Sequence, residues 1–256
     1  MSLLRGLVIL AALTVPAGVV SAAPVNGTGL VTPDVIFGSG NANGSFTGVN
    51  VGGIELALRG KLRYDLSGNP QNTFNYDGVR TYSFDPAQSN APAGRSIFNF
   101  EFSINTDADG TTGLKLDDLT YLLSIDYDPT WNRSVTVDFD PINVLYADHA
   151  LGDNTTPNGG GTTANIFNYT TLIGQKNVAQ NSWNLGFFEP PGFDPQTQGL
   201  YTITLSAFRN KQLVADTWIN VKVGNIPPVP LPAPVLMLGS ALAGLGLIGW
   251  RRRRQA

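Results

Sequence analysis

The residues best placed to bind a metal ion lie in one short polar stretch. Asn105, Asp107 and Asp109 put oxygen ligands at alternate positions, and a glycine follows them. This is the arrangement of the first half of a calcium-binding loop. The twelfth position is Leu116, which cannot supply a carboxylate, but Asp117 just beyond could close a looser site. Two interpretations stay open: a calcium site on these residues, or a polar hairpin loop built from turn-forming residues.

Two Asp-x-Asp-Pro segments form the second group of candidate residues. They are Asp126 with Asp128, and Asp138 with Asp140, each pair directly before a proline. On a strand, residues two apart share one face, so each pair could bind a cation together. Paired carboxylates could also act as the acid and base of glycoside hydrolysis. The alternative is that each Asp-Pro ends a strand and starts a turn.

His149 is the chain's single histidine and follows Asp148 in a polar loop. A catalytic triad or a zinc site needs further partners at defined spacings. No Gly-x-Ser-x-Gly motif, phosphate loop or dinucleotide fingerprint is present, and the chain has no cysteine. We interpret His149 as a structural turn contact and expect neither catalysis nor a resident cofactor, calcium excepted.

Aromatic side chains are the remaining candidates for binding. Exposed aromatic rings beside Asn and Asp could stack on sugars, whereas buried rings fill sandwich cores. The residues that either interpretation concerns are Trp131, Trp183, Trp218, Tyr76, Tyr82, Tyr127, Phe187 and Phe188.

The segments that carry these residues are predicted to form short strands separated by turns. Residues 96–105 alternate, with Phe98, Phe100, Phe102 and Ile104 on the core face. Further strands are predicted at 119–127, 134–139 and 182–188, a strand pair turning at residues 59–60, and a hairpin over 199–223 with its turn at 210–211. Helical periodicity is not convincing anywhere in the body. This pattern predicts an all-β, antiparallel β-sandwich.

An immunoglobulin-like strand order is one form that such a sandwich can take. Tyr201 stands near the start of a strand, where these domains place a tyrosine-corner residue. A plain core aromatic is the alternative for Tyr201.

The main body of the chain is predicted to span residues 23–225, and its charge and length limit the kinds of partner that it can have. All 19 acidic residues fall within it, while 5 of the 16 basic residues, Arg5 and Arg251 to Arg254, fall outside, so its net charge is 11 − 19 = −8. This balance argues against nucleic acid or an anionic membrane surface as the partner. About 200 residues suit one domain with a real core.

The first 22 residues are typical of a secretory signal peptide. One positive charge precedes an apolar stretch and a proline, and small residues end the segment. The small-x-small rule predicts cleavage between Ala22 and Ala23.

The last 31 residues combine three features in a fixed order. A proline-rich spacer contains Val229, Pro230, Leu231, Pro232 and Ala233, and an uncharged apolar run over 235–250 follows. Four arginines, Arg251, Arg252, Arg253 and Arg254, come next and are expected to stop translocation. The run is roughly 16 residues long, or about 20 if residues 231–234 are counted, so it can just cross a bilayer core of about 30 Å.

This tail resembles the VPLPA-CTERM sorting signal, a variant of the PEP-CTERM class. The resemblance covers only the tail. It implies an inner-membrane stage, processing near the proline motif by an exosortase-type enzyme, and delivery to the cell surface or extracellular matrix, often beside exopolysaccharide. We therefore expect a non-catalytic exported surface or matrix protein. The alternative is a carbohydrate- or calcium-dependent adhesive module.

Overall fold

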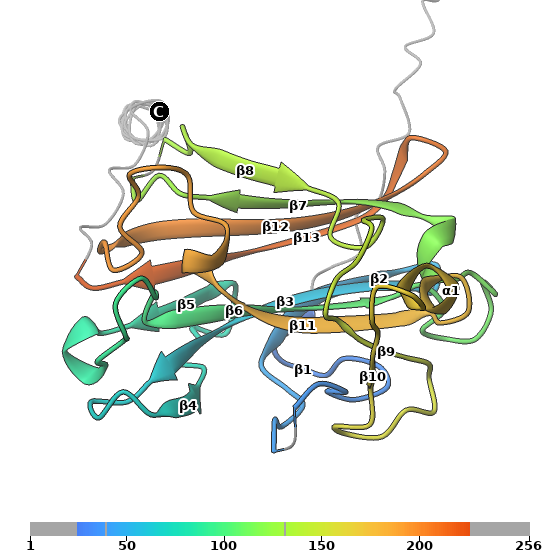
Figure 1. The fold of residues 1–256 in the computed structure, drawn as a ribbon, viewed down its shortest axis with the longest axis horizontal. Coiled ribbons are helices and arrows are strands. Elements are labelled where there is room, and N and C mark those ends of the chain that lie inside the picture. The colour runs from blue at the N-terminus through green and yellow to red at the C-terminus, as the bar shows by residue number, and fades with distance from the viewer. Residues whose placement is uncertain (1–24, 39, 131, 226–256) are drawn as a thin grey trace, which may run out of the picture.

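The computed structural model describes residues 25–38, 40–130 and 132–225, which form two stacked β-sheets (Figure 1). The first sheet has the order β1-β2-β3-β6-β11-β9-β10, with β4 paired to β3, and the second has the order β5-β13-β12-β7-β8. In the first sheet the strands are β1 (Val25–Gly29), β2 (Phe46–Val51), β3 (Ile54–Tyr64), β4 (Pro70–Thr73), β6 (Phe98–Asn105), β9 (Ala150–Gly152), β10 (Thr162–Thr163) and β11 (Val178–Asn184). In the second they are β5 (Thr81–Phe84), β7 (Thr120–Asp126), β8 (Thr136–Phe139), β12 (Gly199–Arg209) and β13 (Gln212–Val223).

Helical structure is confined to short turns in the described part of the chain. These are α1 (Tyr169–Ile173) and three 3-10 turns, η1 (Pro86–Gln88), η2 (Leu116–Asp118) and η3 (Leu185–Phe187). The predicted all-β sandwich is therefore confirmed for the described residues. No helix among the described residues is long and apolar enough to span a bilayer. The predicted signal peptide and the tail at 226–256 lie outside those residues.

One strand pair departs from the predicted antiparallel arrangement. β5 runs parallel to β13, with Tyr82 opposite Val221. β5 is a short edge strand that the chain reaches from β4 in the first sheet, so no hairpin fixes its direction.

The core forms where the alternating faces of the two sheets meet. Phe98, Phe100, Phe102 and Ile104 of β6 are fully buried, as their spacing predicts. The predicted turn at residues 59–60 was wrong, because β3 runs straight through this point. A Cβ at Gly60 would lie 3.1 Å from the Cβ of Tyr82, so the glycine here allows the two sheets to approach closely.

The β12–β13 hairpin confirms the predicted turn. Asn210 and Lys211 adopt φ values of 52° and 65°, the left-handed pair that a tight two-residue hairpin turn requires. At the other end, the Tyr201 hydroxyl donates to the Thr197 carbonyl at 2.6 Å. This is the backbone contact of a tyrosine corner, and the ring is also fully buried in the core.

The outer face of the first sheet is covered by the entry segment at residues 30–45. Thr32 donates its backbone N–H to Glu55 of β3, and Ile36 donates to the buried Gln180 of β11, both at 2.8 Å. Apolar side chains of the segment, among them Val35, pack on the same face. Most polar residues that alternate with the core residues of β3, β6 and β11 are therefore buried as well, among them Arg59, Glu101 and Gln180.

Candidate functional site

The predicted calcium loop is held by its own hydrogen bonds. The fully buried Asn105 carboxamide accepts from the Asp107 N–H at 3.0 Å and from Asn177 Nδ2 at 2.8 Å. Its own Nδ2 donates to the Thr32 carbonyl and to Asn154 Oδ1, so both ends of the amide are engaged. Asn105 therefore ties the loop to the entry segment and to the segments that flank β11.

The aspartates of this loop act in the same way. Asp107 Oδ1 accepts from the N–H and hydroxyl of Thr112, and Asp109 Oδ1 accepts from those of Thr111. Burial would raise the pKa of Asp107, but the Thr112 hydrogen bonds outweigh it and lower that pKa. Asp117 follows in η2 and faces Gly174. No group of three or more His, Asp or Glu side chains that could hold a metal ion occurs within residues 25–38, 40–130 and 132–225.

The first Asp-x-Asp-Pro pair divides into two environments. Asp126 is buried, its Oδ1 accepts from the Asp128 N–H, and burial raises its pKa. Asp128 accepts from the N–H and hydroxyl groups of Thr130 and Ser134, and these bonds hold its pKa well below the ordinary range. Asp128 thereby shapes the turn between β7 and β8.

The second pair follows β8. Asp138 is exposed and lies opposite Ser124 of β7. Asp140 accepts from the N–H groups of Tyr121 and Ile142 and from the backbone and side-chain nitrogens of Asn143. This geometry is that of a strand end and turn, one of the interpretations given for these pairs from the sequence.

His149 is fully buried and packs against Phe102 of β6 and Trp183 of β11. Its Nε2 lies 2.7 Å from the Pro141 carbonyl, which can only accept, so Nε2 carries the proton. Nδ1 then accepts from Asn181 Nδ2 at 3.1 Å. Burial lowers the pKa of His149, outweighing the Pro141 hydrogen bond and the nearby Asp148. The neutral ring packs on Phe102 and therefore lies in the core rather than in the polar turn contact that the sequence predicted.

A pH dependence of stability follows from His149. The unfolded chain takes up a proton there near about pH 6.5, whereas the folded ring stays neutral to lower pH. The stabilisation that His149 gives the folded state is therefore fully present at pH values above its pKa in the unfolded chain. It falls as pH drops through that value, by at most about 1.4 kcal/mol per pH unit.

The measurement is the urea-unfolding free energy of the wild type and of His149→Gln between about pH 5 and 7. The glutamine amide keeps a donor for Pro141 but does not titrate. We expect the wild type to lose stability toward pH 5 faster than the variant. Equal slopes would show that His149 is not held neutral.

The candidate aromatic residues lie in different surroundings. Tyr82 and Tyr127 are fully buried core residues. Trp218 and Phe187 each lie under an arginine, with Arg80 4.4 Å and Arg95 4.7 Å from the ring centroid. Trp183 and Phe188 line a cavity, Tyr76 packs on Tyr82, and Trp131 lies outside the described residues.

That cavity has a volume of about 510 Å³ and lies between the end of β8 and β11. Its lining residues are Phe139, Asp140, Pro141, Val144, Tyr146, Ala147, Asp148, Trp183 and Phe188. The sequence pattern does not predict that Phe139, Tyr146 and Asp148 belong to one site, because only the fold brings their segments close to Trp183. The apolar run at residues 144–146 within a polar loop was the available signal; Val144 and Tyr146 are 39% and 42% exposed.

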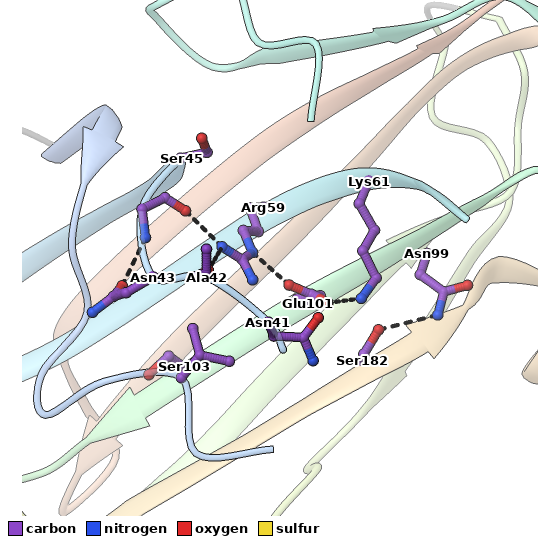
Figure 2. Close-up of polar contacts among 12 residues, drawn as sticks. Asn41, Ala42, Asn43, Ser45, Arg59, Lys61, Asn99, Glu101, Ser103 and Ser182 are labelled. Carbon is purple, nitrogen blue, oxygen red and sulfur yellow. Dashed lines mark hydrogen bonds and ion pairs between the residues drawn. The ribbon is translucent and has the colours of Figure 1, made fainter. Parts of the chain in front are cut away.

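A buried charge cluster lies on the outer face of the first sheet (Figure 2). Glu101 of β6 forms ion pairs with Arg59 and Lys61 of β3, and all three side chains are 3% exposed or less. Arg59 also donates to the Ala42 and Gly44 carbonyls of the entry segment. Burial lowers the pKa of Lys61, and Glu101 partly offsets the effect. The cluster fastens the entry segment to the sheet.

No family model matches this chain, and comparison with curated proteins and with solved structures finds no similar protein.

Proposed function

We propose that the chain is a non-catalytic protein of the bacterial cell surface or extracellular matrix, exported and then processed by an exosortase-type enzyme. The observation that carries this proposal is the order of features in residues 226–256: proline motif, uncharged apolar run, four arginines. A bilayer-length run followed by a basic cluster retains a translocating chain in the inner membrane. The extended proline segment before it gives a protease access.

The body supports an extracellular role. Its net charge of −8 favours solubility. His149, Asp128 and Asp140 are engaged in structural hydrogen bonds. A sandwich built in this way can act as a spacer or matrix unit without turnover.

We further propose that the sandwich is immunoglobulin-like. This proposal rests on the order of the strands in the chain and in the sheets. Strands A, B, E and D of such domains correspond to β3, β6, β11 and β9. Strands C, F and G correspond to β7, β12 and β13. β8 then takes the place of C′. The hydrogen bond from Tyr201 to Thr197 adds the tyrosine corner to this likeness.

The test compares two strains of a Gram-negative host that differ only in the exosortase-type enzyme. With the enzyme present, we expect the protein on the cell surface or in the matrix. Without it, we expect the protein to stay in the inner membrane with its tail, because the apolar run then has no means of release. Equal surface exposure in both strains would refute processing by such an enzyme.

A further inference from the structure

The cavity beside β11 has a continuous aromatic wall. The rings of Trp183 and Phe188 are 4.9 Å apart, those of Phe139 and Phe188 are 5.1 Å apart, and those of Phe139 and Trp183 are 6.0 Å apart. Tyr146 adds a fourth ring to the lining from the segment after β8. Of the aromatic side chains, tryptophan, here Trp183, is the one whose ring attracts cations most strongly.

This wall is fixed from behind. Trp183 packs against Phe102 at 5.1 Å and against His149 at 5.3 Å, both fully buried. Since the ring has little room to turn, a ligand meets a surface that is already in place. Preorganisation of this kind lowers the entropic cost of binding.

Among the residues that the structure describes, the charges that line the cavity are negative. Asp140 and Asp148 contribute carboxylates, and this part of the lining holds no lysine or arginine. The Asp140 carboxylate is held by hydrogen bonds from four nitrogens, so its position is fixed. Asp148 is exposed and uses Oδ1 to accept from Asn181 at 3.0 Å. The cavity therefore complements a positive charge.

Hydrogen bonding separates an organic cation from a sugar as the occupant. A pyranose carries several hydroxyls, and each needs a partner when it is buried. Five of the nine lining residues have no polar side-chain atom: Phe139, Pro141, Val144, Ala147 and Phe188. A methylated ammonium group needs no such partners, because its methyl groups pack on rings while its charge is met by carboxylates.

We propose that this cavity binds a small organic cation, a quaternary or tertiary ammonium group, between the Trp183, Phe139 and Phe188 rings and the Asp140 and Asp148 carboxylates.

The experiment is calorimetric titration of the full chain, in a non-ionic detergent without a sugar head group, at low ionic strength. The ligands are choline and its uncharged isostere 3,3-dimethyl-1-butanol, which share a shape and differ in charge. We expect choline to bind at least about tenfold more tightly than the isostere. Asp148→Asn should weaken choline binding by about threefold to tenfold. The matched control Asp138→Asn, an exposed carboxylate outside the cavity, should leave it unchanged.

Trp183→Ala is unsuitable as the test, because Trp183 packs against Phe102 and His149 and its loss is expected to unfold the protein. Tyr146→Ala removes an exposed ring instead and should also weaken choline binding. Three results would overturn the proposal. They are the absence of choline binding up to about 50 mM, equal binding of the isostere, and binding of glucose where choline fails, which would assign the cavity to a carbohydrate.

Discussion

Glu101→Gln is expected to lower the free energy of unfolding by about 3–5 kcal/mol. Glutamine keeps the size of the side chain but removes the charge that Arg59 and Lys61 share. Two buried cations would then lack a counter-charge where water cannot compensate. Arg59 is held between the rings of Phe46 and Phe74, at 4.2 and 4.3 Å, so it cannot swing out to solvent.

The measurement is urea unfolding of the body, residues 23–225, followed by tryptophan fluorescence. Lys176→Met is the matched control, because Lys176 pairs with Asp153 at 2.8 Å in a partly exposed position. Removal of that pair should cost less than about 1 kcal/mol. Wild-type stability in Glu101→Gln would contradict the role given to the cluster.

A third variant separates charge from packing. Replacing Arg59 and Lys61 by methionine and Glu101 by leucine removes all three charges and keeps most of the volume. Such replacements of buried ion pairs are often neutral or stabilising by about 1–4 kcal/mol. We expect the triple variant to be more stable than Glu101→Gln. If it is equally unstable, the loss in the single variant comes from shape rather than from an unpaired charge.

Deletion of residues 229–256 is expected to abolish surface display and leave the body folded. The described part of the chain ends at Asn225, just after β13, and the two sheets and the core described above are built from residues within it. Without the apolar run and the arginines, the chain has no means of stopping in the inner membrane. We expect it in the periplasm or medium instead.

Cell fractionation with surface protease accessibility measures the location, and circular dichroism with the urea midpoint measures the fold. Replacement of residues 229–256 by a flexible polar linker of equal length controls for chain length and should be misrouted in the same way. Normal surface display of the deleted protein would show that the tail does not sort it.

The sequence predicts those elements whose two faces differ. Phe98 to Ile104 alternate with polar residues, and the β12–β13 hairpin combines alternation with a turn that left-handed residues can form. Local chemistry is sufficient in both cases. The direction of β5 and the continuity of β3 through Gly60 depend on the opposing sheet, which no local pattern describes.

The same limit explains the missed polar cluster and cavity. Glu101 alternates with core residues and Asn105 was a candidate ligand of a metal loop, yet the entry segment covers this face and both are buried. Tyr146 and Trp183 are distant in the chain and line one cavity only because the segment after β8 crosses the edge of the sandwich. Burial of an outer sheet face is a long-range property, so alternation alone cannot reveal it.

The most direct test of the central proposal is mass spectrometry of the mature protein from separated inner-membrane, surface and medium fractions. Sorting predicts an N-terminus at Ala23 and a C-terminus near residues 230–234, in protein recovered outside the inner membrane. A chain that still ends at Ala256 and is found in the inner membrane would contradict it and make the protein an anchored periplasmic domain.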